Sequence, residues 1–118
     1  MELLPQKENL YWTEHARIKM RQYRLSESRV KRVLRFPKRL EIGVAPETVA
    51  AMQPAGSKKH PYEIWVMWVV GYLKSDVRFQ RAKKITIISA WKYPGVSPVH
   101  EPPPIPEDAW EMVRKMKR

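Results

Sequence analysis

The spacing of apolar residues predicts two helices near the start of the chain. Over residues 13–23 apolar side chains recur at intervals of three and four, as on one face of a helix, at Ala16, Met20 and Tyr23. Thr13 and Ser26 are residue types that cap helix N-termini, so a second helix is expected from Ser26 to about Arg35. The two helices would form a hairpin, which Pro37 ends.

Beyond Pro37 the period of the pattern changes to two, which predicts strands. Apolar and polar residues alternate over 40–44, and Thr48 to Gln53 follows as a second strand before a loop over 54–60. The stretch from Tyr62 to Leu73 is apolar on both faces, so this strand is expected at the centre of the sheet. Residues 84–91 form the last strand. Residues 10–12 are interpreted either as a very short strand or as a hydrophobic plug.

The end of the chain differs in composition from the rest. Six prolines between Pro94 and Pro106 indicate an extended segment. A final helix follows, with an apolar stripe made of Ala109, Met112, Val113 and Met116. We therefore expect an α+β domain over residues 1–93, with 1–9 as a loose arm, and then a Pro-rich segment and C-terminal helix over 94–118. The predicted fold is an N-terminal helical hairpin packed on a four-stranded, mainly antiparallel sheet, with the C-terminal helix attached.

Charge adds a functional expectation to this fold. The 118 residues, enough for one domain, include 23 Lys and Arg against 12 Asp and Glu, a formal net charge of +11. Most of the excess lies in two blocks, residues 14–39 and 74–92. Such an excess attracts phosphate-bearing partners, although a basic surface can also serve solubility alone. Arginine dominates the first block and suits bidentate contacts to phosphate, so RNA is the expected polyanion.

The candidate RNA-binding residues are eight of the cations in the two blocks and one aromatic residue beside them. They are Arg17, Arg21, Arg24, Arg29, Arg32, Lys83, Lys84, Lys92 and Tyr93. Tyr93 follows a strand and can stack on a base, whereas aromatic residues in short domains more often belong to the core.

Several classes of protein are disfavoured by what the sequence lacks. There is no cysteine, the histidines at positions 15, 60 and 100 have no metal-ligand spacing, and four glycines offer no phosphate-binding loop. We therefore expect neither a metal nor a cofactor. The longest apolar run, Ile64 to Leu73, is too short to span a bilayer, and the N-terminus lacks signal-peptide features. A cytoplasmic protein that does not bind membranes is expected.

Two segments resemble known families. Thr13-Glu14-His15-Ala16-Arg17-Ile18-Lys19-Met20, followed by Leu25-Ser26 and a helix to Pro37, resembles the opening of an uncharacterised bacterial domain family. Lys84-Ile85-Thr86-Ile87-Ile88-Ser89-Ala90 is similar to the last strand of BrnT-type toxins, relatives of RelE-type endoribonucleases. The resemblance covers about residues 10–93. It implies helices followed by an antiparallel sheet, and a small antitoxin-like protein as a partner.

The resemblance also implies metal-independent cleavage of RNA, with basic side chains that stabilise charge on the scissile phosphate. The residues that would inherit catalytic roles are His15, as proton carrier, and Arg17, Lys84 and Lys92, with Lys83 beside them. The BrnT-like pattern has a basic residue directly after Ile-Ser-Ala, whereas this chain has Trp91 there and Lys92 one position later.

The function favoured by the sequence is thus RNA binding by a RelE/BrnT-like domain, with endoribonuclease activity left open. Two alternatives remain. One is a non-catalytic nucleic-acid or ribosome-associated module, and the other is a protein-interaction module that binds an acidic partner.

Overall fold

The computed structural model describes residues 10–72 and 83–116. The arm predicted for residues 1–9 and the basic side chains at positions 74, 78 and 81 lie outside the described residues. In chain order the elements are β1 (Leu10–Trp12), α1 (Glu14–Tyr23), α2 (Glu27–Arg35), β2 (Arg39–Ile42), β3 (Thr48–Gly56), β4 (Pro61–Tyr72), β5 (Lys83–Pro94) and α3 (Glu107–Met116).

The strands form one mixed sheet in the order β1-β5-β4-β3-β2. All neighbours are antiparallel except β1, which pairs in parallel with β5 through Leu10 and Ile85. The prediction of four strands was therefore wrong, because residues 10–12 form a fifth strand too short to show a period. The prediction of a central β4 is confirmed, since Trp65 and Met67 are both fully buried.

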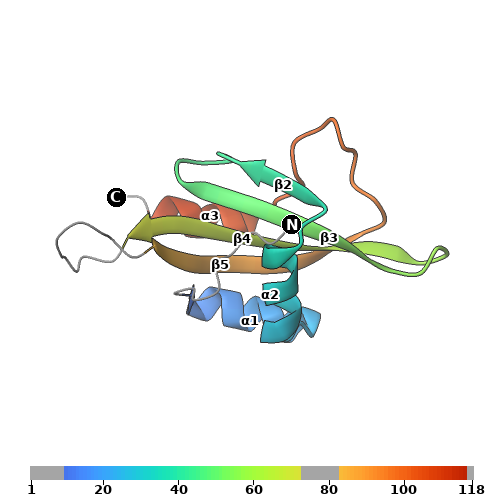
Figure 1. Ribbon diagram of the computed structural model, residues 1–118, viewed down its shortest axis with the longest axis horizontal. Coiled ribbons are helices and arrows are strands. Elements are labelled where there is room, and N and C mark those ends of the chain that lie inside the picture. Colours follow the sequence, from blue (N-terminus) through green and yellow to red (C-terminus); the bar gives the residue numbers. More distant parts are fainter. Residues whose placement is uncertain (1–9, 73–82, 117–118) are drawn as a thin grey trace.

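Helices cover both faces of the sheet (Figure 1). On one face α1 and α2 pack over a core that includes Ala16, Val30 and Ile64. On the opposite face α3 places Ala109 and Val113 against Trp65, Met67 and Trp91. The rings of Trp65 and Trp91 stack in parallel with centroids 6.1 Å apart. Each large apolar side chain buried in this way contributes about 1.5–3 kcal/mol, so both faces stabilise the sheet.

The start of α1 is fixed to β5 by the hydroxyl of Thr13. This hydroxyl accepts a hydrogen bond from the N–H of Ala16 at 3.0 Å and donates one to the carbonyl of Ile87 at 3.1 Å. A β-bulge lies at this point, because Met67 pairs with Ser89 but Trp68 pairs with Ile87, which leaves Ile88 as the extra residue. The bulge disrupts the ladder where β1 ends, and α1 continues along β5 from there.

Strand β3 is longer than predicted. The loop expected over 54–60 begins later than predicted, because the strand continues to Gly56 and Pro54 pairs with Glu63, which leaves residues 57–60 between β3 and β4. The pairing of β2 with β3 ends at Met52, so beyond that residue β3 is bordered by β4 alone. Pro54 is tolerated there, because a proline at a sheet edge removes no hydrogen bond to a neighbouring strand. Gly56 then turns the chain with φ +81°, and a Cβ there would collide with the carbonyl oxygen of His60.

None of the helices within residues 10–72 and 83–116 has the length and apolar character needed to cross a membrane.

Candidate nucleic-acid interface

Tyr62, the second residue of β4, contacts one cation and lies near a second. The ammonium of Lys92 on the neighbouring strand β5 lies 5.0 Å from the centroid of its ring. Arg29 on α2 lies close enough to Tyr62 for this residue to favour a higher pKa of the guanidinium. Because Tyr62 is only partly buried, a ligand can reach both the ring and the cations beside it.

Gln53 on β3 holds Arg29 in place. Its side-chain oxygen accepts a hydrogen bond from Nη1 of Arg29 at 2.5 Å, and its amide nitrogen donates to the carbonyls of Phe36 at 2.7 Å and Arg32 at 3.3 Å. The bond to Phe36 satisfies a carbonyl at the C-terminal end of α2, and the bond to Arg32 is shared with the N–H of Phe36, so that both fasten this end to the sheet. We call Arg29, Arg32, Gln53, Tyr62 and Lys92 the Tyr62 cluster.

The Tyr62 cluster carries positive charge without a balancing acid. Partial burial and then the charge of Arg32 lower the pKa of Arg29, while Tyr62 opposes the shift, and the guanidinium remains protonated. Within the described part of the chain, no carboxylate forms an ion pair with Arg29, Arg32 or Lys92. The aromatic ring of Phe36, next to the cluster, is 50% exposed. Cations beside accessible rings are what single-stranded nucleic acids require.

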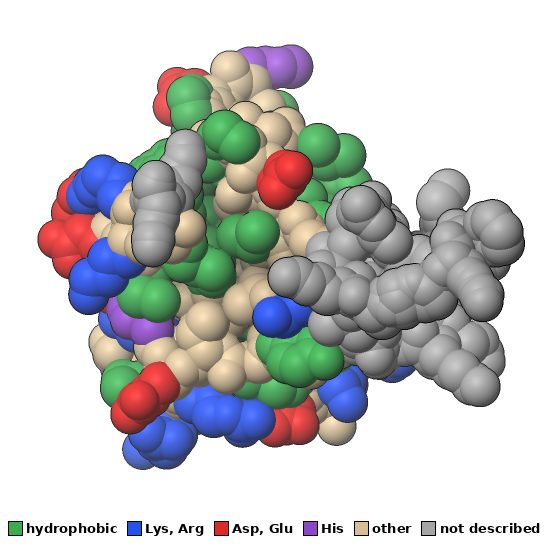
Figure 2. All heavy atoms as spheres, turned by 90° about the vertical axis from the view of Figure 1, so that its left-hand side faces the viewer, with side chains coloured by type: hydrophobic (Ala, Val, Ile, Leu, Met, Phe, Trp, Pro, Cys, Tyr) green, Lys and Arg blue, Asp and Glu red, His purple; other side chains and the backbone are tan. Residues whose placement is uncertain are grey.

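The cations of α1 have different surroundings. Nη1 of Arg17 forms an ion pair with Glu27 at 3.0 Å, and its guanidinium lies 5.7 Å from the centroid of the Trp12 ring. Arg21 and Arg24 are exposed near the C-terminal end of the helix. Figure 2 shows Lys and Arg side chains gathered along the lower margin of the molecule, with acidic side chains between them. This margin is therefore partly neutralised.

The remaining predicted contacts lie elsewhere on the sheet. Lys84 lies at the start of β5, where its ammonium is 4.8 Å from the centroid of the Tyr11 ring. It is eight residues from Lys92 on the same strand, a separation of roughly 26 Å. Lys83 begins β5, and its side chain lies outside the described part. Tyr93 points to the opposite face from Lys92 and packs partly against the core under α3.

His15, the predicted proton carrier, faces the C-terminal helix. Its Nε2 is 3.9 Å from Oδ2 of Asp108, and the ammonium of Lys19 binds the same oxygen at 2.9 Å. Burial of Asp108 acts to raise its pKa. This effect is outweighed by the hydrogen bond and the charge of Lys19, by the charge of His15 and by the backbone N–H of Ala109. The pKa of Asp108 is therefore lowered. Among the described atoms, Nε2 of His15 has no hydrogen-bond partner. These contacts join α1 to α3.

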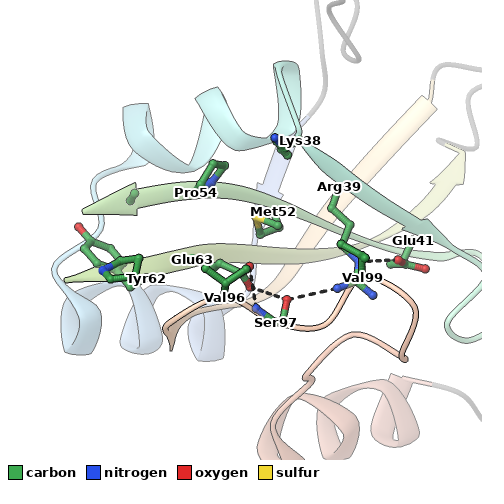
Figure 3. Close-up of a pocket in the computed structure, with 12 residues that line it drawn as sticks. Lys38, Arg39, Glu41, Met52, Pro54, Tyr62, Glu63, Val96, Ser97 and Val99 are labelled. Atoms are coloured by element: carbon green, nitrogen blue, oxygen red, sulfur yellow. Dashed lines mark hydrogen bonds and ion pairs between the residues drawn. The ribbon is translucent and has the colours of Figure 1, made fainter. Parts of the chain in front are cut away.

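A cavity of about 450 Å³ lies mainly on the α3 face of the sheet, where Met52 and Glu63 point, and Tyr62 is among the residues that line it. The chain segment after β5 crosses over it, as Figure 3 shows. The residues that line it are Lys38, Arg39, Glu41, Met52, Pro54, Ala55, Pro61, Tyr62, Glu63, Val96, Ser97 and Val99. Its volume falls within the range of about 300–1,000 Å³ that is common for small-ligand sites.

A network of hydrogen bonds fastens the crossing segment to the sheet. The carboxylate of Glu63, only 2% exposed, accepts hydrogen bonds from the backbone N–H of Ser97 at 3.0 Å, from its hydroxyl at 2.6 Å and from Nε1 of Trp65 at 3.0 Å. Arg39 donates to the hydroxyl of Ser97 at 3.2 Å and to Glu41 at 2.7 Å (Figure 3). Arg39 also binds the carbonyls of Pro98 and Glu101. The polar side chains of Glu63, Ser97, Arg39 and Glu41 are thus engaged with one another.

The structure brings together only part of the predicted interface. Arg29, Arg32 and Lys92 share the Tyr62 cluster, whereas Arg17, Lys84, Tyr93 and His15 contact other partners. Sequence reasoning missed Tyr62, Gln53 and the cavity. One signal was present, because Glu63 is the only acid in the apolar stretch from Tyr62 to Leu73.

No family model matches this chain, and searches among curated proteins and among solved structures found no significant match. Within the described residues, no group of three or more His, Asp or Glu side chains is placed to hold a metal ion.

Proposed function

We propose that this protein binds RNA and that the Tyr62 cluster is the centre of the binding surface. The observation that carries the proposal is that Lys92 lies over one partly exposed aromatic ring, with Arg29 near that ring and Arg32 near Arg29, and that none of the three cations forms an ion pair with a described carboxylate. Cations that already have an acidic partner must lose it before they bind phosphate. The three cations of the cluster have no acidic partner among the described residues, so they can bind phosphate without losing one.

The arrangement favours a single strand over a duplex. Phosphates would bind the two arginines and Lys92, and unpaired bases would stack on Tyr62 and on Phe36. Base stacking on an aromatic side chain contributes about 1–3 kcal/mol and is available to every base, so we propose little sequence preference. In a duplex the bases already stack on one another, and only the phosphates would be engaged.

RNA cleavage remains a prediction that the geometry does not favour. A 2′-hydroxyl attack on phosphorus needs a proton carrier and cations at the same phosphate. His15 lies beside Asp108, Arg17 beside Glu27, and Lys84 and Lys92 lie roughly 26 Å apart on β5. We therefore propose binding as the function and leave cleavage as a separate expectation, tested below.

A small protein partner and a cytoplasmic location are part of the same proposal. The partner would have an acidic surface, because the charges that attract RNA also attract carboxylates. Such a partner would compete with RNA for the Tyr62 cluster.

The test of the proposal compares two matched double variants. Arg32→Gln with Lys92→Gln removes two cations of the cluster, and Arg114→Gln with Lys115→Gln removes two cations from α3. Binding of a fluorescent single-stranded RNA is measured by anisotropy over a range of salt concentrations. Each phosphate contact contributes about 0.7 to the slope of log K against log salt for single strands, so loss of two contacts should flatten the slope by about 1.4.

The α3 variant has the same net charge and should keep the slope of the unmodified protein. Equal slopes for the two variants would mean that binding follows net charge alone, and the Tyr62 cluster would no longer be the proposed site.

A further inference from the structure

The turn between β3 and β4 carries two adjacent lysines. It consists of Ser57, Lys58, Lys59 and His60, all of them exposed, and we call these four residues the tip turn. The N–H of Ser57 donates to the carbonyl of His60 at 3.3 Å, and the N–H of His60 donates to the hydroxyl of Ser57 at 3.1 Å. The backbone of the two lysines is therefore ordered before any ligand binds, which lowers the entropic cost of binding.

The tip turn lies at one end of the longest axis of the molecule, beyond the ends of α1 and α2 (Figure 1). The pairing of β2 with β3 ends at Met52, and the pairing of β5 with β4 ends at Tyr62. Beyond these points β3 and β4 pair only with each other. The end of the hairpin therefore projects from the sheet, and a ligand can approach its lysines from outside.

The ring of Tyr62 fixes the tip turn next to the Tyr62 cluster. A Cβ placed on Gly56 would lie 2.9 Å from Cδ1 of this ring and would also collide with the carbonyl oxygen of His60, so the glycine backbone packs closely against both. The ammonium of Lys92 lies 5.0 Å from the centroid of the same ring. His60 is two residues from Tyr62 along the chain, a separation of roughly 7 Å. The tip turn and the cluster thus share one aromatic side chain.

The charge of the tip turn is not offset by an acid within the described part of the chain. Lys58 and Lys59 form no ion pair with the described residues. Residues 53–62 contain no Asp or Glu. The next residue, Glu63, is 2% exposed and its carboxylate binds Ser97 and Trp65 on the α3 face. Phosphate can therefore bind the two lysines without displacing a carboxylate.

We propose that the tip turn is a second phosphate-binding point, so that a single RNA strand runs from the C-terminal end of α2 across the ring of Tyr62 to Lys58 and Lys59. This inference rests on the proposed function and gives the bound strand a path. Cations lie on both sides of one ring, so a base stacked on Tyr62 would have partners for the phosphates that precede and follow it. Gln53, which binds Arg29, is five residues before Lys58, so the path along β3 is roughly 17 Å long. This length holds several nucleotides, and single-stranded sites commonly cover about 4–16.

The test compares three double variants that each remove two positive charges. They are Lys58→Gln with Lys59→Gln in the tip turn, Arg32→Gln with Lys92→Gln in the Tyr62 cluster, and Arg114→Gln with Lys115→Gln in α3. Anisotropy measures the binding of a mixed-sequence RNA of about 10 nucleotides over a range of salt concentrations. Loss of two contacts should flatten the slope of log K against log salt by about 1.4 in each of the first two variants. The α3 variant should keep the slope of the unmodified protein.

The outcomes separate the inference from the proposed function. If the tip-turn variant keeps the slope of the α3 variant while the cluster variant flattens it, the inference is wrong and the proposed function stands. If neither variant flattens the slope, both fail. A slope flattened by the tip-turn variant alone would place the RNA at the turn without the Tyr62 cluster, which would overturn the path as well as the proposed site.

A second pair of variants tests the position of the tip turn without a change of charge. Gly56→Ala places a methyl group against the ring of Tyr62 and the carbonyl of His60, so the turn must shift. Gly43→Ala is the matched control, because Gly43 has nearly the same φ, +83°, but a Cβ there meets no other described residue within 4 Å. At a temperature at which circular dichroism shows both variants folded, only Gly56→Ala should flatten the salt slope for the same RNA. Equal slopes for the two alanine variants would mean that the placement of the turn against Tyr62 does not matter for binding, and the inference would fail.

Discussion

Ser97 binds the carboxylate of Glu63 twice, through its hydroxyl at 2.6 Å and through its backbone N–H at 3.0 Å. The two residues are 34 positions apart in the chain. This pair fastens the segment between β5 and α3 to the centre of the sheet. It therefore determines both the shape of the cavity and the path of the chain toward α3.

Replacement of Glu63 by alanine should destabilise the fold strongly. Three donors, two from Ser97 and one from Trp65, would lose their acceptor in a buried place, and we expect the free energy of unfolding in urea to fall by about 3 kcal/mol. Ser97→Ala removes only the hydroxyl and should cost about half as much. Glu111→Ala, on the exposed side of α3, is the control. A loss below about 1 kcal/mol for Glu63→Ala would mean that the network contributes little.

Thr13→Val should destabilise the junction between α1 and β5. The valine has the same shape but neither accepts from Ala16 nor donates to Ile87, so a loss of about 1–2 kcal/mol is expected. For a domain of this size that corresponds to a fall in Tm of roughly 4–8 °C, which calorimetry measures. Thr13→Ser keeps the hydroxyl and should stay near the Tm of the unmodified protein. Equal Tm values for the valine and serine variants would contradict this account of the cap.

The contact of α1 with α3 should depend on pH. Because the pKa of Asp108 is lowered from its ordinary value of 3.8, the folded state binds this proton less readily than the unfolded chain does. The stabilisation from Asp108 is therefore complete above about pH 5 and is lost as the pH falls through the folded-state pKa. Urea unfolding of the unmodified protein and of Asp108→Asn should differ most near neutral pH and converge in acid.

Lys19→Met provides the matched background for this test. Lys19 supplies the hydrogen bond to Asp108, so the effect of Asp108→Asn and its dependence on pH should both become smaller in that background. If the effect of Asp108→Asn depends on pH equally in both backgrounds, a group other than Lys19 lowers the pKa of Asp108.

RNA cleavage, where purified protein produces it, should not require a metal ion. Cleavage should then persist in EDTA, because fixed cations would stabilise the charge on phosphorus, and should be lost in His15→Ala and Lys92→Ala. The assay follows bulk RNA on a gel, with Arg114→Ala as a control on α3. Cleavage that needs added Mg²⁺, or that survives both substitutions, would exclude the catalytic set predicted from the sequence.

The parts of the fold that could be predicted carry their signals locally. Thr13 and Ser26 cap the two helices as expected, with bonds to Ala16 and Arg29 at 3.0 Å. The central strand was recognisable because both of its faces are apolar. Strand β1 could not be counted, since three residues show no period and its partner strand is far away in the chain.

The candidate site was predicted only in part, because some of its residues carry no local signal. Arg29, Arg32 and Lys92 belong to basic blocks that composition reveals, but Tyr62 and Gln53 look like ordinary strand residues until α2 is placed beside them. Tyr93 was chosen because it was expected just past the end of a strand, but β5 continues to Pro94, so Tyr93 is next to Lys92 within that strand. Neighbouring residues on a strand point to opposite faces, so that adjacency separates them.

The parallel pairing of β1 with β5 has a consequence for synthesis of the chain. Thr13 and Ile87, which bond at the end of this pairing, are 74 residues apart. At about 5–20 residues per second a ribosome needs about 4–15 seconds to make that length, so the first strand to emerge waits longest for its partner. Until β5 appears, Leu10 and Trp12, which pack against the core of the folded protein, have no strand beside them and remain exposed to solvent or to other proteins.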